Sequence, residues 1–333
     1  MNALFFRRLF VVGAMVSVMA YADGAHANVI IDYPDFSNTS GLTLVGPSDY
    51  NGVGPTQYTY TTTTGDGTVL RLADGEYQKC HWDDPNSCSK QHNLEGGAAY
   101  SSSAVALGAS NTFSTTFQFR FTDPGGYNPN GPADGITFVL AASPNGLGGG
   151  GIGLGYGGVS NSLAIEFDTF QNGELGESND NHVGIDVNGA LNDYNEASPY
   201  GVDGSQACAL STGTPGPGCM ANGDLWTVLV GYDGGSNKLT VSVQDGNATP
   251  DLLIDTTSFD IASIIGSANA YVGFTGSTGS AWANEDIKDW QFANTTELSS
   301  PSPVPEPETY AMLLAGLGLL GFMARRRKQE EAA

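Results

Sequence analysis

One segment of the chain concentrates side chains that could bind a metal ion. Residues 163–188 read LAIEFDTFQNGELGESNDNHVGIDVN. If this segment begins as a β-strand, Glu166 and Asp168 project from the same face, because side chains alternate along a strand. Two adjacent carboxylates repel each other unless a cation lies between them. A loop rich in Asn, Asp and Glu follows, and it ends at His182.

These groups favour particular ions. Carboxylates, Asn side chains and backbone carbonyls suit Ca²⁺, whereas an added imidazole suits a transition ion such as Mn²⁺. The segment therefore predicts a metal site on a strand and the loop after it. The plain alternative is a solvated acidic loop.

The surrounding sequence predicts an all-β protein. Thr112–Phe121 (TFSTTFQFRF) alternates and places four Phe side chains on one face. No long helical period occurs in the body of the chain, and Gly, Asn, Asp and Pro separate the short apolar segments, as in a sandwich or barrel. Further strands are expected at residues 136–141, 162–167, 183–187, 226–232, 238–243 and 271–275.

The charge excludes one class of partner. The 333 residues include 35 acidic and 12 basic ones, and residues 28–304 hold 30 acidic but only 6 basic side chains. Such a body repels phosphate backbones, so nucleic acid is not expected as a partner. Divalent cations and neutral ligands fit this charge better.

Both ends of the chain look like targeting segments. Residues 1–27 have a basic start at Arg7 and Arg8, an apolar stretch and the small-residue site Ala25-His26-Ala27, which predict a cleaved signal peptide. At the other end, Val304-Pro305-Glu306-Pro307 precedes a short apolar run and four adjacent basic residues. This order resembles a PEP-CTERM sorting signal. The resemblance implies export across the inner membrane of a Gram-negative bacterium, with an exosortase processing the tail.

The boundaries that follow are a signal peptide at 1–27, a body at 28–295, a Ser/Pro-rich linker with the PEP motif at 296–309, and an apolar helix with an Arg cluster at 310–333. The apolar run, Tyr310 to Ala324, is short for a transmembrane helix but long enough to enter the inner membrane transiently, with its basic end on the cytoplasmic side.

The four cysteines agree with an oxidising compartment. Three pairings are possible. The two local ones, Cys80 with Cys88 and Cys208 with Cys219, are favoured because each pair lies in a loop-like stretch. A zinc site is the alternative, although neither spacing is typical of structural zinc.

The metal segment resembles that of the legume-type (L-type) lectins, whose loop has Glu, Asp, an aromatic residue, Asn, a carboxylate and His at matching intervals. Weaker family-like blocks extend over the body, among them residues 36–46, 97–102, 133–140, 226–239 and 286–292. The resemblance implies a jelly-roll β-sandwich that binds Ca²⁺ and a Mn²⁺-type ion. The implied metal ligands are Glu166, Asp168, the Phe170 carbonyl, Asn172, Glu177 and His182.

Glu177 departs from the family, which usually has Asp at this position. The longer side chain would weaken one ion site, or Asp180 would take over its role. The resemblance also implies a sugar site made by Asp134, a Gly near Gly150, Asn172 and the Phe170 ring, with a cis peptide bond at Ala133-Asp134.

A carbohydrate-binding protein of the cell surface or extracellular matrix, and not an enzyme, is therefore expected. Two alternatives stay open. The first is a structural matrix protein that has lost sugar binding. The second is a glycoside hydrolase, but Phe170 and Gln171 stand where a retaining hydrolase of this type would need its second Glu.

Overall fold

The computed structural model describes the body of the chain and neither of its ends. The predicted signal peptide and the predicted tail helix both lie outside the described residues, and no helix within them is long and apolar enough to cross a membrane. Only the backbone is described between residues 77 and 91. The described residues are 28–46, 59–75, 77–81, 84–91, 96–126, 131–144, 146–202, 204, 206–210, 215–296 and 298.

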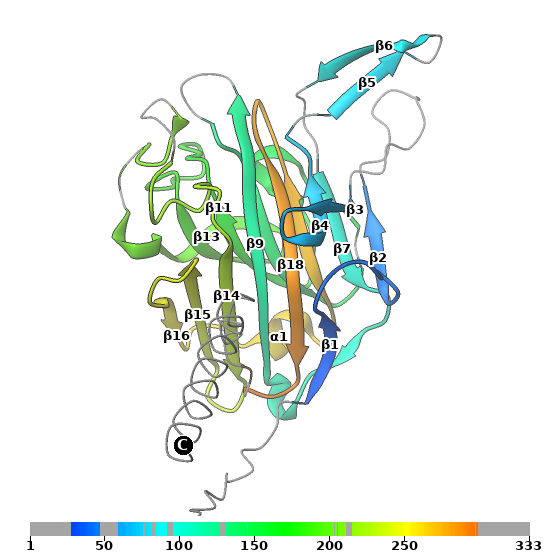
Figure 1. Cartoon of the computed structure of the whole chain (residues 1–333). Coiled ribbons are helices and arrows are strands. Elements are labelled where there is room, and N and C mark those ends of the chain that lie inside the picture. The colour runs from blue at the N-terminus through cyan, green and yellow to red at the C-terminus, as the bar shows by residue number, and fades with distance from the viewer. Residues whose placement is uncertain are drawn as a thin grey trace, which may run out of the picture.

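Two antiparallel eight-stranded sheets form a sandwich (Figure 1). The first has the order β16-β15-β14-β9-β18-β4-β3, with β1 also paired to β18. Its strands are β1 (Val29–Tyr33), β3 (Tyr60–Thr64), β4 (Gly67–Ala73), β9 (Phe113–Gly126), β14 (Trp226–Asp233), β15 (Lys238–Asp245), β16 (Asp251–Thr256) and β18 (Ala281–Ala293).

The second sheet has the order β13-β12-β11-β10-β17-β7-β2, with β8 also paired to β17. Its strands are β2 (Leu42–Val45), β7 (Gly96–Ser101), β8 (Val105–Ala106), β10 (Gly135–Ala141), β11 (Ser162–Asp168), β12 (His182–Val187), β13 (Ala190–Ala197) and β17 (Asn269–Ser277). A separate hairpin, β5 (Tyr77–His81) with β6 (Asp84–Gln91), stands off one end of the sandwich in Figure 1.

Helices are few among the described residues. One short α-helix, α1 (Ile261–Ile265), precedes β17. Three single 3₁₀ turns are η1 (Ala109–Asn111), η2 (Gly151–Gly153) and η3 (Pro199–Gly201). The prediction of an all-β jelly-roll sandwich is confirmed.

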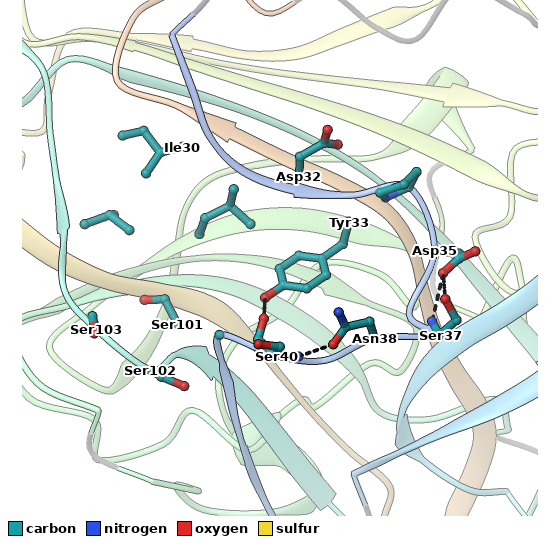
Figure 2. Close-up of a pocket in the computed structure, with 14 residues that line it drawn as sticks. Ile30, Asp32, Tyr33, Asp35, Ser37, Asn38, Ser40, Ser101, Ser102 and Ser103 are labelled. Atoms are coloured by element: carbon teal, nitrogen blue, oxygen red, sulfur yellow. Dashed lines mark hydrogen bonds between the residues drawn. The ribbon is translucent and has the colours of Figure 1, made fainter.

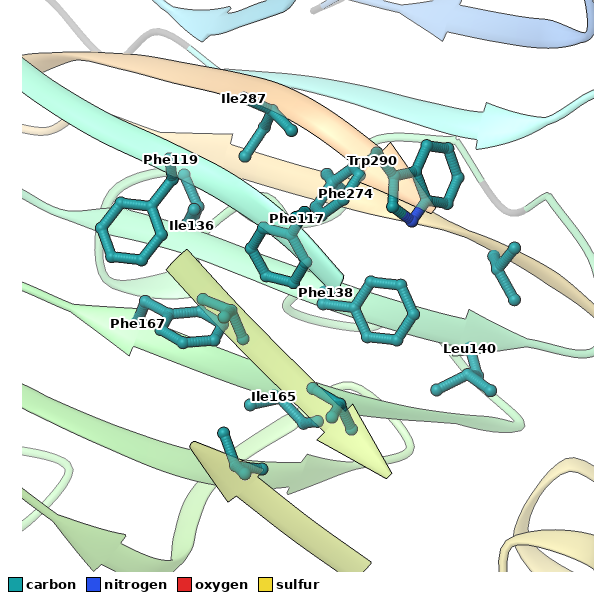
Figure 3. Close-up of a cluster of buried hydrophobic side chains, with 14 of the residues drawn as sticks. Phe117, Phe119, Ile136, Phe138, Leu140, Ile165, Phe167, Phe274, Ile287 and Trp290 are labelled. Atoms are coloured by element: carbon teal, nitrogen blue, oxygen red, sulfur yellow. The ribbon is translucent and has the colours of Figure 1, made fainter. Parts of the chain in front are cut away.

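Aromatic side chains fill the space between the sheets. The four Phe residues of β9 that alternate in the sequence, Phe113, Phe117, Phe119 and Phe121, are all at most 1% exposed. Phe117 lies against Phe167 and Phe274 of the opposite sheet, at ring-centroid distances of 5.7 and 4.9 Å (Figure 3). These contacts fix the two sheets against each other, because closely packed interiors resist displacement.

The seven strands expected from the sequence all form, with ends shifted by a few residues. Strand β13 was not predicted, since its sequence ALNDYNEA has no apolar alternation. It is the outermost strand of the second sheet, and its largely exposed positions do not need an apolar face.

Candidate functional site

Strand register aligns the predicted metal and sugar residues in one row. Asp168, at the end of β11, pairs with His182 on β12 and with Gly135 on β10. Because Gly135 follows Asp134, residues from three separate segments come together at one end of strands β10, β11 and β12. Glu166 is two residues before Asp168 and shares its face.

Glu166, Asp168 and His182 form the buried centre of this site. One ligand atom from each lies within 4.8 Å of the others, and all three residues are at most 1% exposed. His182 Nδ1 lies 3.1 Å from the Asn179 carbonyl. Since a carbonyl only accepts hydrogen bonds, Nδ1 carries the proton, and the lone pair of Nε2 faces Glu166 Oε1 at 3.8 Å. This orientation is that of a histidine ready to bind a metal.

The loop from residue 169 to 181 folds back over these side chains. The Phe170 N–H donates to Asp168 Oδ1 at 2.6 Å, and the Asn172 N–H donates to Glu177 Oε2. Glu177 is 5% exposed, and its carboxylate lies within 4.8 Å of ligand atoms of His182 and Asp193. Phe170 is half-buried.

Buried atoms without hydrogen-bond partners gather here. They include Glu166 Oε1, His182 Nε2, Asn172 Oδ1, Asp134 Oδ2, Asp186 Oδ2 and Asp193 Oδ1. An unpaired buried polar atom costs free energy, and most native proteins have few of them. Five of these six atoms are carboxylate or amide oxygens and the sixth is an imidazole nitrogen, so the donor set fits a divalent cation.

The electrostatics support the same reading. Burial, followed by the effect of neighbouring carboxylates, raises the pKa values of Glu166 and Asp168 well above their ordinary range. Burial also raises the pKa of Glu177 to about 8, and it lowers the pKa of His182, which favours the neutral imidazole. Buried carboxylates this close to one another repel each other, and a bound proton or cation relieves that repulsion.

Asp134 lies beside the metal cluster. Its peptide bond to Ala133 is cis, as the family resemblance implies. Its backbone carbonyl accepts from the Thr169 N–H at 2.9 Å, which ties it to the residue after Asp168. The side chain is 4% exposed, and burial raises its pKa to about 7.

Gly150 lies at the same end of the sheet, in the Gly-rich segment of residues 148–158. Ser277, at the end of β17, joins the two parts: its carbonyl accepts from the Asp134 N–H at 3.1 Å, and its hydroxyl donates to the Gly151 carbonyl at 3.1 Å. Gly150 is exposed. The segment is folded on itself by a bridge between Gly149 and Gly157.

Asp180 does not replace Glu177. Its two carboxylate oxygens accept hydrogen bonds from the Cys208 N–H at 3.1 and 3.2 Å. Among the described residues it belongs to none of the carboxylate–histidine groups. Of the two alternatives for Glu177, this geometry does not favour replacement by Asp180, because the backbone of a distant loop already uses its carboxylate.

That distant loop is closed by the predicted Cys208–Cys219 disulfide, which is present. We call residues 206–220 the disulfide loop. Its Leu210 N–H donates to the Gly131 carbonyl at 2.7 Å, and Asn181 is hydrogen bonded to its Gly218 and Met220 at 2.9 Å. The backbones of Cys80 and Cys88 are direct partners in the β5–β6 hairpin, but their side chains lie outside the described part.

Two site residues escaped the sequence analysis. Asp186 shares a strand face with His182, four positions earlier, so alternation along β12 was an available signal. Asp193 comes from β13. The two carboxylates and Glu166 have oxygens within 4.8 Å of one another.

A separate groove of about 710 Å³ lies beside β1 and contains none of the predicted site residues (Figure 2). Ser101, Ser102 and Ser103 line one side. Tyr33 lies at its centre and donates from its hydroxyl to the Ser40 carbonyl at 2.7 Å. The Tyr33 ring stacks on Phe36 and Trp290.

Comparison with known proteins adds family information. The family model of the legume lectin domain matches residues 58–307, and the model of the PEP-CTERM protein-sorting motif matches residues 303–328. Lectin-like protein At1g53070 of Arabidopsis thaliana is 32% identical over 195 residues, covering 55% of this chain and 67% of that protein.

A lectin of Pisum sativum is 29% identical over 203 residues, which cover 57% of this chain and 64% of the lectin. L-type lectin-domain containing receptor kinase VIII.1 of Arabidopsis thaliana is 28% identical over 208 residues. These residues cover 60% of this chain but only 26% of the kinase.

Solved lectin structures share the fold. Lectin UEA-II in complex with galactose has a TM-score of 0.55 at 19% identity, covering 79% of this chain and 97% of the lectin. The metal-free form of lectin I-B4 from Griffonia simplicifolia has a TM-score of 0.55 at 22% identity, covering 79% of this chain and 98% of that one.

Proposed function

We propose, because the chain belongs to the legume lectin domain family, that it binds a glycan through a site organised by Ca²⁺. Carbohydrate binding is the activity common to the lectins it resembles. The observation that carries the proposal is the cluster of buried, unpartnered metal-binding atoms at the ends of β10, β11 and β12.

Two ions would share the carboxylates of this site. Glu166, Asp168, Glu177 and His182 would hold a Mn²⁺-type ion. Asp168, Glu177, the Phe170 carbonyl and the Asn172 side chain would hold Ca²⁺. Bound there, the ions supply positive charge that neutralises the repelling carboxylates and fixes the loop.

The sugar would be bound by groups that the loop presents. The Asn172 amide, the Asp134 carboxylate and a backbone N–H near Gly150 would contact its hydroxyls, and the Phe170 ring would lie against its apolar face. Asp134 Oδ2 has no hydrogen-bond partner inside the protein, which leaves it free to accept from a sugar hydroxyl.

The carboxylates favour binding over hydrolysis. A general acid must reach the glycosidic oxygen, whereas Glu166 and Asp168 are each 1% exposed. Gln171 stands where a second Glu would be needed, and its amide donates to the backbone carbonyl of Glu177 at 3.0 Å.

A glycan screen with the purified full-length chain, in Ca²⁺ and in chelator, tests the proposal. We expect binding in Ca²⁺ only, and its loss in Asn172→Ala and in Asp134→Asn. Asn247→Ala, in the exposed turn after β15, and Asp255→Asn, on the exposed face of β16, are matched controls that should bind normally. Unchanged binding in both site variants would refute the assignment.

One observation favours a second candidate, a structural matrix protein without sugar binding. Glu177, where the family usually has Asp, places its carboxylate on the backbone N–H of Asn172, so the loop is held in part without an ion. A folded protein that binds no glycan in either buffer would support this second function.

The sorting motif bears on where the protein acts. Residues 303–328 match the PEP-CTERM protein-sorting motif, which suggests export through the envelope of a Gram-negative bacterium. We propose that an exosortase processes the tail after it enters the inner membrane transiently, and that the lectin domain acts at the cell surface or in the extracellular matrix.

A further inference from the structure

We propose that Asp193 supplies an additional carboxylate ligand to the Mn²⁺-type ion of this site. The inference rests on the proposed function, since it concerns the same ion. It concerns a residue that neither the motif in the sequence nor the resemblance assigns, because Asp193 lies outside the segment from Glu166 to His182.

Asp193, like Glu166 and His182, belongs to two of the three ligand groups. Its carboxylate lies within 4.8 Å of Glu177 and His182 in one group, and of Glu166 and Asp186 in another. An ion between Glu166 and His182 would therefore lie within reach of it. Asp193 Oδ1 is buried and has no hydrogen-bond partner, so this oxygen is available as a metal ligand.

The backbone of β13 is shaped to deliver this side chain. Its pairing with β12 is irregular. Ile185 of β12 pairs with Tyr194 of β13, but Val187, only two residues later on β12, pairs with Ala190, which is four residues from Tyr194. Such bulges re-aim side chains. Asp193 itself has a φ of 46°, a left-handed conformation that Asp tolerates better than most residues.

Asp186 holds the bulge in position. Its Oδ1 accepts hydrogen bonds from the N–H groups of Asn192, at 2.7 Å, and Asp193, at 3.3 Å. Asp186 is thus a positioning residue, which fixes the backbone that carries the proposed ligand while its other oxygen faces the cluster.

Gly184 provides the space. It lies between His182 and Asp186 on the same face of β12, and a Cβ there would collide with Glu166 Oε1 and lie 3.1 Å from Asp193 Cα. The absence of a side chain allows Glu166 and Asp193 to approach from opposite sides.

No side-chain cation among the described residues neutralises the added carboxylate. The ion pairs of Arg71, Arg120 and Lys238 are made with acids elsewhere, and the charge of Lys288 acts on Asp289. A divalent ion would supply the positive charge that these carboxylates need. With Asp193 in its coordination sphere, the ion would keep one bound water fewer, and the added oxygen ligand would shift the preference of the site toward ions such as Mn²⁺.

Titration of the full-length chain with Mn²⁺ tests the proposal. Free Mn²⁺ is measured by electron paramagnetic resonance, and water bound to the protein-held ion by proton relaxation. Asn suits a positive φ, so Asp193→Asn is the conservative change. We expect Mn²⁺ affinity to fall by at least about tenfold and relaxivity per bound ion to rise, as water replaces the lost ligand.

Two comparisons distinguish the loss of a metal ligand from a structural effect of the substitution. Asp255→Asn removes the same charge from the exposed face of β16 and should match the wild type. In chelator, Asp193→Asn should melt no lower than the wild type, because it relieves repulsion. A lower melting temperature without a relaxivity change would indicate a structural role and overturn the proposal, as would Mn²⁺ affinity and relaxivity equal to wild type. A wild-type chain that binds neither Mn²⁺ nor Ca²⁺ would refute the proposed metal site as well.

Discussion

Acidification should diminish the stabilisation that Ca²⁺ gives to this protein. Burial raises the pKa of Glu177 from 4.5 to about 8 and that of Asp134 from 3.8 to about 7. Without metal, the fold therefore favours the protonated carboxyls. Their contribution to stability is fully present below the ordinary pKa values and is lost as the pH rises through the raised ones. Ca²⁺ binding instead requires ionised Glu177, so the metal-bound state gains with rising pH.

The size of the effect follows from the raised pKa of Glu177. Displacing one proton costs about 1.4 kcal/mol per pH unit well below that pKa, and at the pKa itself the group is already half ionised. Ca²⁺ affinity should therefore fall about fiftyfold from about pH 8 to about pH 6. At a Ca²⁺ concentration well above Kd this equals about 2.3 kcal/mol of stabilisation. With about 2–4 °C per kcal/mol for a domain of this size, the gap in Tm changes by about 5–9 °C.

Differential scanning calorimetry at both pH values, in Ca²⁺ and in chelator, measures this gap. We expect Tm in chelator to fall as the pH rises, while the Ca²⁺-dependent increase in Tm becomes larger. Glu177→Gln should flatten both trends, and Asp255→Asn should keep them. Parallel curves in Ca²⁺ and chelator would refute the reasoning, since they would mean that the ion displaces no proton from the buried carboxyls.

Two further predictions concern the packing and the disulfide. Phe117→Ala should destabilise the fold by about 3–5 kcal/mol in urea unfolding, because the ring is fully buried against the opposite sheet; a loss below about 1 kcal/mol would show that the sheets repack freely. Replacing Cys208 and Cys219 together by Ser should cost about 2–3 kcal/mol and weaken Ca²⁺ binding in calorimetric titration. The same exchange at Cys80 and Cys88 is the control, and equal Ca²⁺ affinity in both folded variants would show that the disulfide does not support the site.

The fold class could be predicted from the sequence because a local pattern of apolar residues marks several of its strands. Alternating Phe residues from 113 to 121 can face only one side of a strand, and all are buried. Strand β13 could not be found in this way. It lies at the edge of its sheet, its positions are largely exposed, and its residues are mostly polar. Pairing with β12 alone makes it a strand.

The same distinction applies to the site: residues marked by a local pattern were predicted, and residues brought in from elsewhere were not. Glu166, Asp168 and His182 were found because alternation and a short loop bring them together, and the register of β11 with β12 does so in the structure. Asp193 was not found, because it arrives through a bulge that no local pattern marks. The hydrogen bond of Asp180 could not be predicted either, because its partner, the Cys208 N–H, lies 28 residues away.

The disulfide loop contacts two parts of the proposed site that are far apart in the sequence. It is hydrogen bonded to Asp180 and Asn181, at the end of the loop from residue 169 to 181. It is also hydrogen bonded to Gly131, three residues before Asp134. If an ion binds as proposed, the closed ring and the ion would stabilise the same arrangement of these segments. Linkage between two such equilibria is reciprocal. Reduction that loosens the loop would then weaken cation binding, and an occupied cation site would in equal measure make the disulfide harder to reduce.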